Sequence, residues 1–248
     1  YNYKALRAEL QQQGYAFFSE GDSEVILKAF HAWGAQCLAR LHGMFAFAIW
    51  NVQSKELFLA RDRLGIKPLY YNLTTTGIRF ASSMQALLAA GDVDTRIDPI
   101  ALHHQLTLHA VIPAPRTILS GIRKLPPAKS LSVNLAGRVS EQRYWTLQAT
   151  RNTIHSEPEW IDAIHTCLRQ AVKRRRDIAD VPVGVLLSGG LDSSLLVALL
   201  VEAGVSDLKT YSIGFEDVPE EKGSEFEYSD LIVDRYQTEH YKFIIPNG

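Results

Sequence analysis

The sequence contains little cysteine and no long apolar run. Cys37 and Cys167 are its only cysteines among 248 residues, and they lie far apart in the chain. Two thiols so placed offer neither metal-ligand spacing nor a disulfide framework, which favours a reducing compartment. No apolar run approaches the roughly 18 residues needed to cross a bilayer, so we expect no membrane partner. A cytoplasmic protein is the simplest interpretation.

The sequence also lacks an excess of charge of either sign. Its 26 Lys and Arg residues face 27 Asp and Glu residues, for a net charge of −1, and such a balance predicts no nucleic-acid partner. One basic run, residues 173–176, ends a predicted helix, where cations interact favourably with the helix dipole. We interpret this run as a solvated helix end. The histidines are scattered, apart from His103 and His104, and suggest no metal site.

The two ends of the sequence do not resemble native termini. The chain begins with Tyr1 rather than Met, and it ends at Gly248 just after the apolar residues 243–245. We expect both ends to lack residues of the native protein, and we expect those residues to hold part of its chemistry.

The first half of the sequence reads as mixed α and β structure. Asp22 or Ser23 can cap a helix whose apolar residues recur at helical spacing and which Gly34 closes. Three short apolar runs follow, and runs of this kind predict strands buried on both faces. They are residues 43–50, 57–60 and 69–71. Residues 148–157 hold few apolar side chains, so we place a domain boundary there, between residues 1–150 and 151–248.

The second half has the pattern of a parallel α/β domain. Ser156 and Glu159 have the spacing of a capping box at the start of a helix. Strand, helix and strand are then predicted over residues 181–187, 191–203 and 208–213. A β-α-β unit of this size is typical of parallel, doubly wound sheets.

A loop between this strand and helix carries the clearest chemical signal. Its residues are Ser188, Gly189, Gly190, Leu191, Asp192, Ser193 and Ser194. The two glycines allow the backbone to turn sharply and to bring N–H groups close to an oxyanion. The serines add hydroxyl donors, and the helix that begins near Leu191 directs its positive end at the same place. Together these features predict a phosphate or pyrophosphate site.

Asp192 needs a separate explanation, because a carboxylate repels phosphate. It suits the loop if it binds Mg²⁺, which bridges phosphate oxygens. The loop lacks the lysine of a G-x-x-x-x-G-K-[ST] motif, and the sequence has no G-x-G-x-x-G. The alternative is an ordinary glycine turn followed by a Ser/Asp helix cap.

The loop resembles the PP-loop of N-type ATP pyrophosphatases, which cleave ATP between the α and β phosphates. A wider series resembles the glutamine-hydrolysing asparagine synthetase family. It consists of residues 22–27, 43–48, 60–71 and 180–187. The resemblance implies an αββα, Ntn-hydrolase-like class II glutaminase domain lacking its first part. An incomplete PP-loop synthetase domain would follow it. Ammonia from glutamine would pass through a tunnel to an acyl-adenylate.

The resemblance also implies roles for individual residues. Asp22 matches a position that binds the α-amino group of glutamine, although from the sequence alone a helix cap is favoured. Leu187 and Ile213 match positions that contact adenosine through backbone groups, and both also suit strand core. The family's nucleophile is an N-terminal Cys, which this chain does not show, so its catalytic residue is unknown; Cys37 and Cys167 are interpreted as structural.

One branch of the family matches more closely, the bacterial N-acetylglutaminylglutamine amidotransferases. The residues that carry this likeness are 31–34, 102–104, 109–118 and 221–230. The expected small molecules are glutamine, ATP with Mg²⁺, and a carboxylate of an amino acid or a dipeptide. Free aspartate, an intramolecular ring closure and a non-catalytic ATP-binding relative are the alternatives. A homodimer is retained as one option for assembly.

Overall fold

The computed structural model describes residues 1–75, 77–149, 156–216 and 224–246. The chain divides into two compact units, Tyr1–Ala149 and Thr150–Gly248. Most of the predicted boundary, residues 150–155, lies outside the described residues, as do residues 221–223 of one branch-specific stretch. Within the described part, no helix is long and apolar enough to span a membrane.

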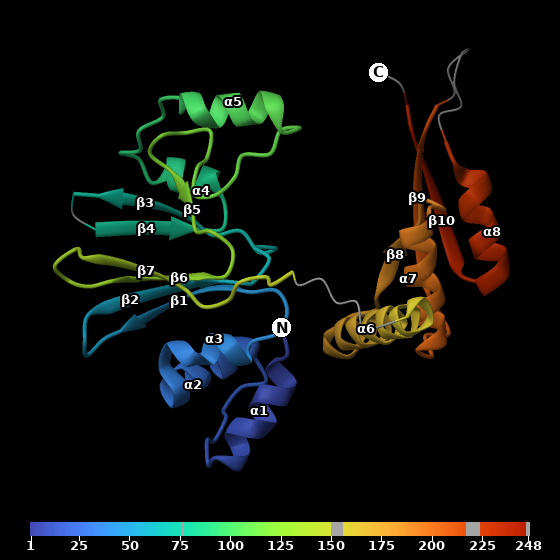
Figure 1. The fold of residues 1–248 in the computed structure, drawn as a ribbon, viewed down its shortest axis with the longest axis horizontal. Coiled ribbons are helices and arrows are strands. Elements are labelled where there is room, and N and C mark those ends of the chain that lie inside the picture. The colour runs from blue at the N-terminus through green and yellow to red at the C-terminus, as the bar shows by residue number, and fades with distance from the viewer. Residues whose placement is uncertain (76, 150–155, 217–223, 247–248) are drawn as a thin grey trace. The chain divides into compact units, whose positions relative to one another are not determined.

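The first unit begins with a layer of helices (Figure 1). These are α1 (Tyr3–Gln12), α2 (Asp22–Trp33), a 3₁₀ turn (Gly34–Gln36) and α3 (Cys37–Arg40). The helix predicted to close at Gly34 is confirmed. The predicted side-chain cap is wrong, because α2 begins at Asp22 itself. Gly21 occupies the N-cap position, and no side chain makes a cap hydrogen bond.

Two antiparallel sheets follow the helices. The first has the order β1-β2-β6-β7, and the second has the order β4-β3-β5. Their strands are β1 (Ala46–Asn51), β2 (Glu56–Arg61), β3 (Tyr70–Thr74), β4 (Gly77–Ala81), β5 (Arg123–Lys124), β6 (Lys129–Val133) and β7 (Val139–Arg143). Two further helices, α4 (Met84–Ala89) and α5 (Pro99–Thr107), lie on the side of the second sheet away from the first (Figure 1).

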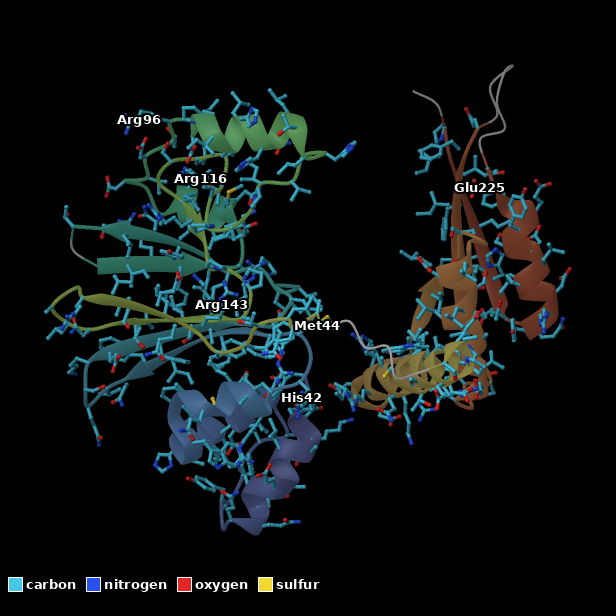
Figure 2. The ribbon with its side chains drawn as sticks, viewed as in Figure 1. His42, Met44, Arg96, Arg116, Arg143 and Glu225 are labelled. Carbon is cyan, nitrogen blue, oxygen red and sulfur yellow. The ribbon has the colours of Figure 1, made fainter. Side chains whose placement is uncertain are left out.

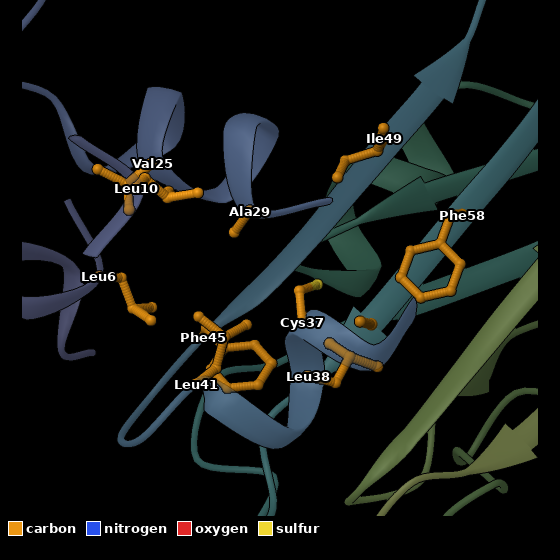
Figure 3. Close-up of a cluster of buried hydrophobic side chains, with 11 residues drawn as sticks. Leu6, Leu10, Val25, Ala29, Cys37, Leu38, Leu41, Phe45, Ile49 and Phe58 are labelled. Carbon is orange, nitrogen blue, oxygen red and sulfur yellow. The ribbon is translucent and has the colours of Figure 1, made fainter. Parts of the chain in front are cut away.

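Two apolar clusters hold these layers together. Leu59, Leu131 and Tyr71 belong to the cluster that joins the two sheets. On the other side of the first sheet, Phe58 packs with side chains from the helices, as Figure 3 shows. Strand β2 is therefore buried on both faces, as its apolar run predicts. The same prediction is wrong for β1, where Trp50 is 49% exposed, because β1 lies at the edge of its sheet.

The second unit has a three-stranded parallel sheet in the order β10-β9-β8. Its elements are α6 (Glu157–Ile178), β8 (Gly184–Leu186), α7 (Leu191–Glu202), β9 (Lys209–Phe215), α8 (Phe226–Tyr236) and β10 (Glu239–Ile245). The predicted capping box is confirmed: the backbone N–H of Ser156 donates to Glu159 Oε2 at 2.7 Å. The predicted β-α-β unit is confirmed as well, and with it the mixed α/β class.

The helices of this unit share one apolar cluster with one face of the sheet. Val185 and Leu187 from the strand side pack there with Val197 of α7. Side chains at alternate strand positions point to the opposite face, where Leu186 is 74% and Ile213 is 57% exposed. The described residues therefore show helices on a single face, and the doubly wound arrangement stays a prediction. On α6 the apolar residues Trp160, Ile161 and Ile164 of the first half are exposed, whereas Val172 in the second half is buried.

Candidate functional site

The loop from Ser188 to Ser194 joins the carboxyl end of β8 to α7, the edge at which parallel sheets bind ligands. Leu187 is 1% exposed, and its backbone N–H donates to Tyr211 O at 2.7 Å. The Ser212 hydroxyl donates to the carbonyl of Leu187. These two hydrogen bonds tie the start of the loop to β9, so the backbone direction is fixed before the chain turns.

Gly189 makes the turn possible. Its φ is +85°, a conformation that side chains disfavour. A Cβ at this position would lie 2.5 Å from Tyr228 Cβ and 2.6 Å from the backbone nitrogen of Ser229. Both distances are far below van der Waals contact, so the loop passes α8 at a spacing that only glycine permits. The predicted need for glycine therefore has a structural reason at this position.

The serines of the loop form a small hydrogen-bonded group. Ser188 Oγ and Ser193 Oγ are 3.1 Å apart, and Ser188 Oγ accepts from the backbone N–H of Gly190 at 3.3 Å. Ser193 Oγ also donates to the carbonyl of Gly190 at 3.2 Å. Ser194 Oγ is buried with no hydrogen-bond partner among the described residues. An orphaned buried hydroxyl costs about 1–3 kcal/mol.

Beside the loop lies a cavity of about 290 Å³. It brings together Leu187, Ser188 and Ile213 from the predicted set. Sequence reasoning missed Ser212 and Ser229, which also line it. The alternation of β9 could have found Ser212, because a hydroxyl at a buried strand position needs a partner. Glu225, labelled in Figure 2 just before α8, lies at the same cavity.

Asp192 lies in the first turn of α7 and is exposed. No ion pair occupies its carboxylate among the described residues, and it does not line the neighbouring cavity. The described residues also contain no group of three His, Cys, Asp or Glu side chains that could hold a metal alone. This donor set fits Mg²⁺ held by one carboxylate together with ligand phosphates, and it does not fit a metal held by protein alone.

The first unit has its own cavity, of about 490 Å³, at the beginning of α2. Asp22 and Ser23 line it with Met44, which Figure 2 labels, and with Lys67. The Ser23 hydroxyl donates to Asp22 Oδ1 at 3.3 Å, and the Tyr1 hydroxyl donates to the Asp22 carbonyl. Asp22 thus caps no helix and is one of the residues that line this cavity.

Asp62 fixes the walls of this cavity, although it does not line it. Its side chain is 1% exposed and accepts backbone N–H groups on two sides. Phe45 donates to it at 3.3 Å, and Ile66 and Lys67 donate at 2.9 Å each. A buried carboxylate with this many donors holds two distant segments in one geometry. No local pattern in the sequence reveals this role, because its partners are backbone groups.

The surroundings of Cys37 do not suit a nucleophile. Cys37 is buried in the helix-side core, and burial raises the pKa of its thiol to about 11. A thiol with such a pKa stays protonated and unreactive at neutral pH. Cys167 is exposed on α6, and neither cysteine forms a disulfide.

Comparison with known families decides the assignment. Residues 1–145 match the glutamine amidotransferase domain, and residues 163–248 match asparagine synthase. The first match covers more than half of the chain. The chain belongs to the glutamine amidotransferase family. Its two matched regions have the order that the sequence resemblance implies.

Several curated relatives resemble this amidotransferase chain. Asparagine synthetase [glutamine-hydrolyzing] 3 of Bacillus subtilis is 33% identical over 99% of this chain and 41% of its own length. A putative asparagine synthetase [glutamine-hydrolyzing] of Mycobacterium bovis is 39% identical over 87% of this chain and 34% of its own length. Amidase chry2 of Gibberella zeae is 29% identical over 88% of this chain and 34% of its own length. The chain thus spans about a third to two-fifths of the length of these relatives.

Proposed function

We propose that this chain serves an enzyme that amidates a carboxylate at the expense of ATP and glutamine. The second unit would activate the carboxylate as an acyl-adenylate and release pyrophosphate. The first unit would bind glutamine, whose ammonia then displaces AMP. The observation that carries this proposal is the loop at Gly189, where backbone donors, hydroxyls and the start of α7 converge at the carboxyl edge of a parallel sheet.

The loop residues have separate roles in this proposal. Backbone N–H groups and hydroxyls of Ser188 to Ser194 would bind the pyrophosphate portion of ATP, with the Gly190 N–H exchanging its bond to Ser188 Oγ for a phosphate oxygen. Leu187, which follows β8, and Ile213 of β9 would contact the adenosine. Asp192 would hold Mg²⁺, which neutralises charge on the departing phosphates when bound.

The first unit would supply the nitrogen. Asp22 would bind the ammonium group of glutamine, since Asp22 lines the 490 Å³ cavity and its carboxylate caps no helix. The helix-sheet-sheet-helix layers support an Ntn-hydrolase-like assignment for this unit. The parallel sheet supports a doubly wound fold for the second, with the exposed face at Leu186 covered in the whole enzyme. We place the enzyme in the cytoplasm.

The acceptor is proposed to be the carboxylate of an amino acid or a dipeptide. Relatives named asparagine synthetase favour aspartate, whereas the branch-specific stretches favour an N-acetylated glutaminylglutamine dipeptide. Pyrophosphate release measured against a panel of these carboxylates separates them, because only the true acceptor raises the rate.

Asp192→Ala tests the activation step in the intact enzyme. We expect pyrophosphate release to fall below detection, since the carboxylate that would hold Mg²⁺ is lost. Asp207→Ala is the matched control, because Asp207 is an exposed carboxylate that precedes β9, at the opposite edge of the sheet. It should release pyrophosphate at the unmodified rate. Retained release in Asp192→Ala would sink the assigned role of this loop.

A further inference from the structure

A third cavity, of about 350 Å³, lies in the first unit between α4, α5 and β5. It shares no lining residue with the cavity at Asp22. Leu69 and Tyr70 show the separation most directly, because successive residues of an extended chain point to opposite faces. Leu69 lines the cavity at Asp22, and Tyr70 lines this one. The proposed reaction therefore leaves the third cavity unused.

Lys124 lines this cavity, and its amine has no carboxylate partner among the described residues. Lys124 Nζ donates to the carbonyl of Ile112 at 2.5 Å, and no acidic side chain pairs with it among the described residues. Burial lowers the pKa of Lys124, and the nearby Arg61 guanidinium lowers it further. A negative group bound next to the amine would offset both effects, because an opposite charge favours the charged form. The Lys124 amine thus lacks a negatively charged partner, which a bound anion would supply.

The walls of the cavity are held by hydrogen bonds that do not involve the free donors of Lys124. Asp98 caps α5 by accepting from Ile100 N at 2.9 Å, and Arg116, labelled below α5 in Figure 2, pairs with its other oxygen. The backbone N–H of Lys124 donates to Pro115 O at 2.9 Å. Because Arg116 already neutralises Asp98, that carboxylate is not available to Lys124.

We propose that this cavity binds a small carboxylate anion. Its carboxylate would pair with the Lys124 amine, which has donors left after its bond to Ile112. Tyr70 and Gln105 also line the cavity. Neither the Tyr70 hydroxyl nor the Gln105 side-chain amide is hydrogen-bonded within the described part of the chain. They supply neutral donors for the remaining oxygen, and Met84 supplies an apolar wall for the carbon chain.

The test follows the Lys124 side chain by NMR in the full chain, labelled with ¹³C-lysine. Sodium acetate is titrated against sodium chloride at constant ionic strength, and sodium phosphate forms a separate arm. We expect a saturable shift of the Lys124 Cε resonance with acetate only. The affinity for acetate, measured from the saturable shifts of the Ile112 and Gln105 backbone amides, should fall at least about tenfold in Lys124→Met. Lys129→Met is the matched control, because Lys129 already pairs with Glu141, and it should bind acetate as the unmodified chain does.

A second measurement needs no variant and covers the case in which Lys124→Met fails to fold. Saturating acetate should move the Lys124 titration midpoint to higher pH by at least about half a unit, because the bound anion favours the charged amine. An unchanged midpoint would overturn the proposal. So would equal acetate binding by Lys124→Met and the unmodified chain, or saturable binding of phosphate in place of acetate.

Discussion

The loop at Gly189 and the cavity at Asp22 are built in opposite ways. The loop consists of consecutive residues, and its key contacts join Ser188, Gly190 and Ser193 within one turn. The cavity draws its walls from several separate stretches of the first unit, and buried Asp62 holds them in place. A local motif thus forms the proposed nucleotide loop, whereas the proposed glutamine site depends on the tertiary fold.

This difference predicts how each region responds to substitution. A single backbone change in the loop should remove its function at once, because its N–H groups come from a few consecutive residues. A change of one side chain in the cavity should weaken the binding of glutamine and leave the ATP-dependent activation step unchanged. Three substitutions test this contrast, from the largest expected effect to the smallest.

Gly189→Ala should have the largest effect. The added Cβ would lie 2.5 Å from Tyr228 Cβ, so the loop must move away from α8. We expect pyrophosphate release to fall by at least about 100-fold, the size of losing an oxyanion donor. Gly204→Ala is the control, since its φ of +87° is similar and its Cβ would meet nothing within 4 Å. It should cost about 1–3 kcal/mol of stability and leave the rate unchanged; equal rates in both variants would contradict the tight passage at α8.

Asp22→Asn should have an intermediate effect that is confined to glutamine. Loss of a charged hydrogen bond costs about 1.5–3 kcal/mol, which corresponds to a KM for glutamine raised about 10–100-fold. Amidation with added ammonia should proceed at the unmodified rate. Glu20→Gln removes a nearby exposed carboxylate and should change neither value. An equal loss with ammonia would show that Asp22 supports the fold and not the substrate.

Glu24→Gln should have the smallest effect, on stability alone. Burial raises the pKa of Glu24, but the Lys28 ammonium and donors from Ser19 and Phe18 outweigh burial and lower that pKa to about 2. The group therefore stabilises the fold fully above its ordinary pKa of 4.5, and this contribution is lost as pH falls toward 2. The free energy of unfolding, measured between pH 5 and 2, should fall less steeply in the variant. If the free energy of unfolding fell equally steeply with pH in the variant and in the unmodified chain, the assigned pKa would be contradicted.

The same contrast explains what the sequence could predict. The strand, loop and helix around Gly189 follow from local chemistry, so their order and the parallel pairing were predictable. The role of Asp62 was not, because its donors are backbone groups that include the distant Phe45. The alternation of β9 could have indicated a buried Ser212, but its partner, the carbonyl of Leu187, lies 25 residues away. Asp22 shows the intermediate case: its position at a helix start was predictable, but the absence of a cap bond depends on Gly21 and on the cavity beside it.

The products of ATP consumption test the central claim most directly. The intact enzyme, supplied with ATP, glutamine and its acceptor carboxylate labelled with ¹⁸O, is followed by ³¹P NMR. Attack of the carboxylate on the α phosphate predicts AMP and pyrophosphate, with one ¹⁸O transferred to AMP. Formation of ADP and inorganic phosphate would contradict adenylation at the Ser188–Ser194 loop.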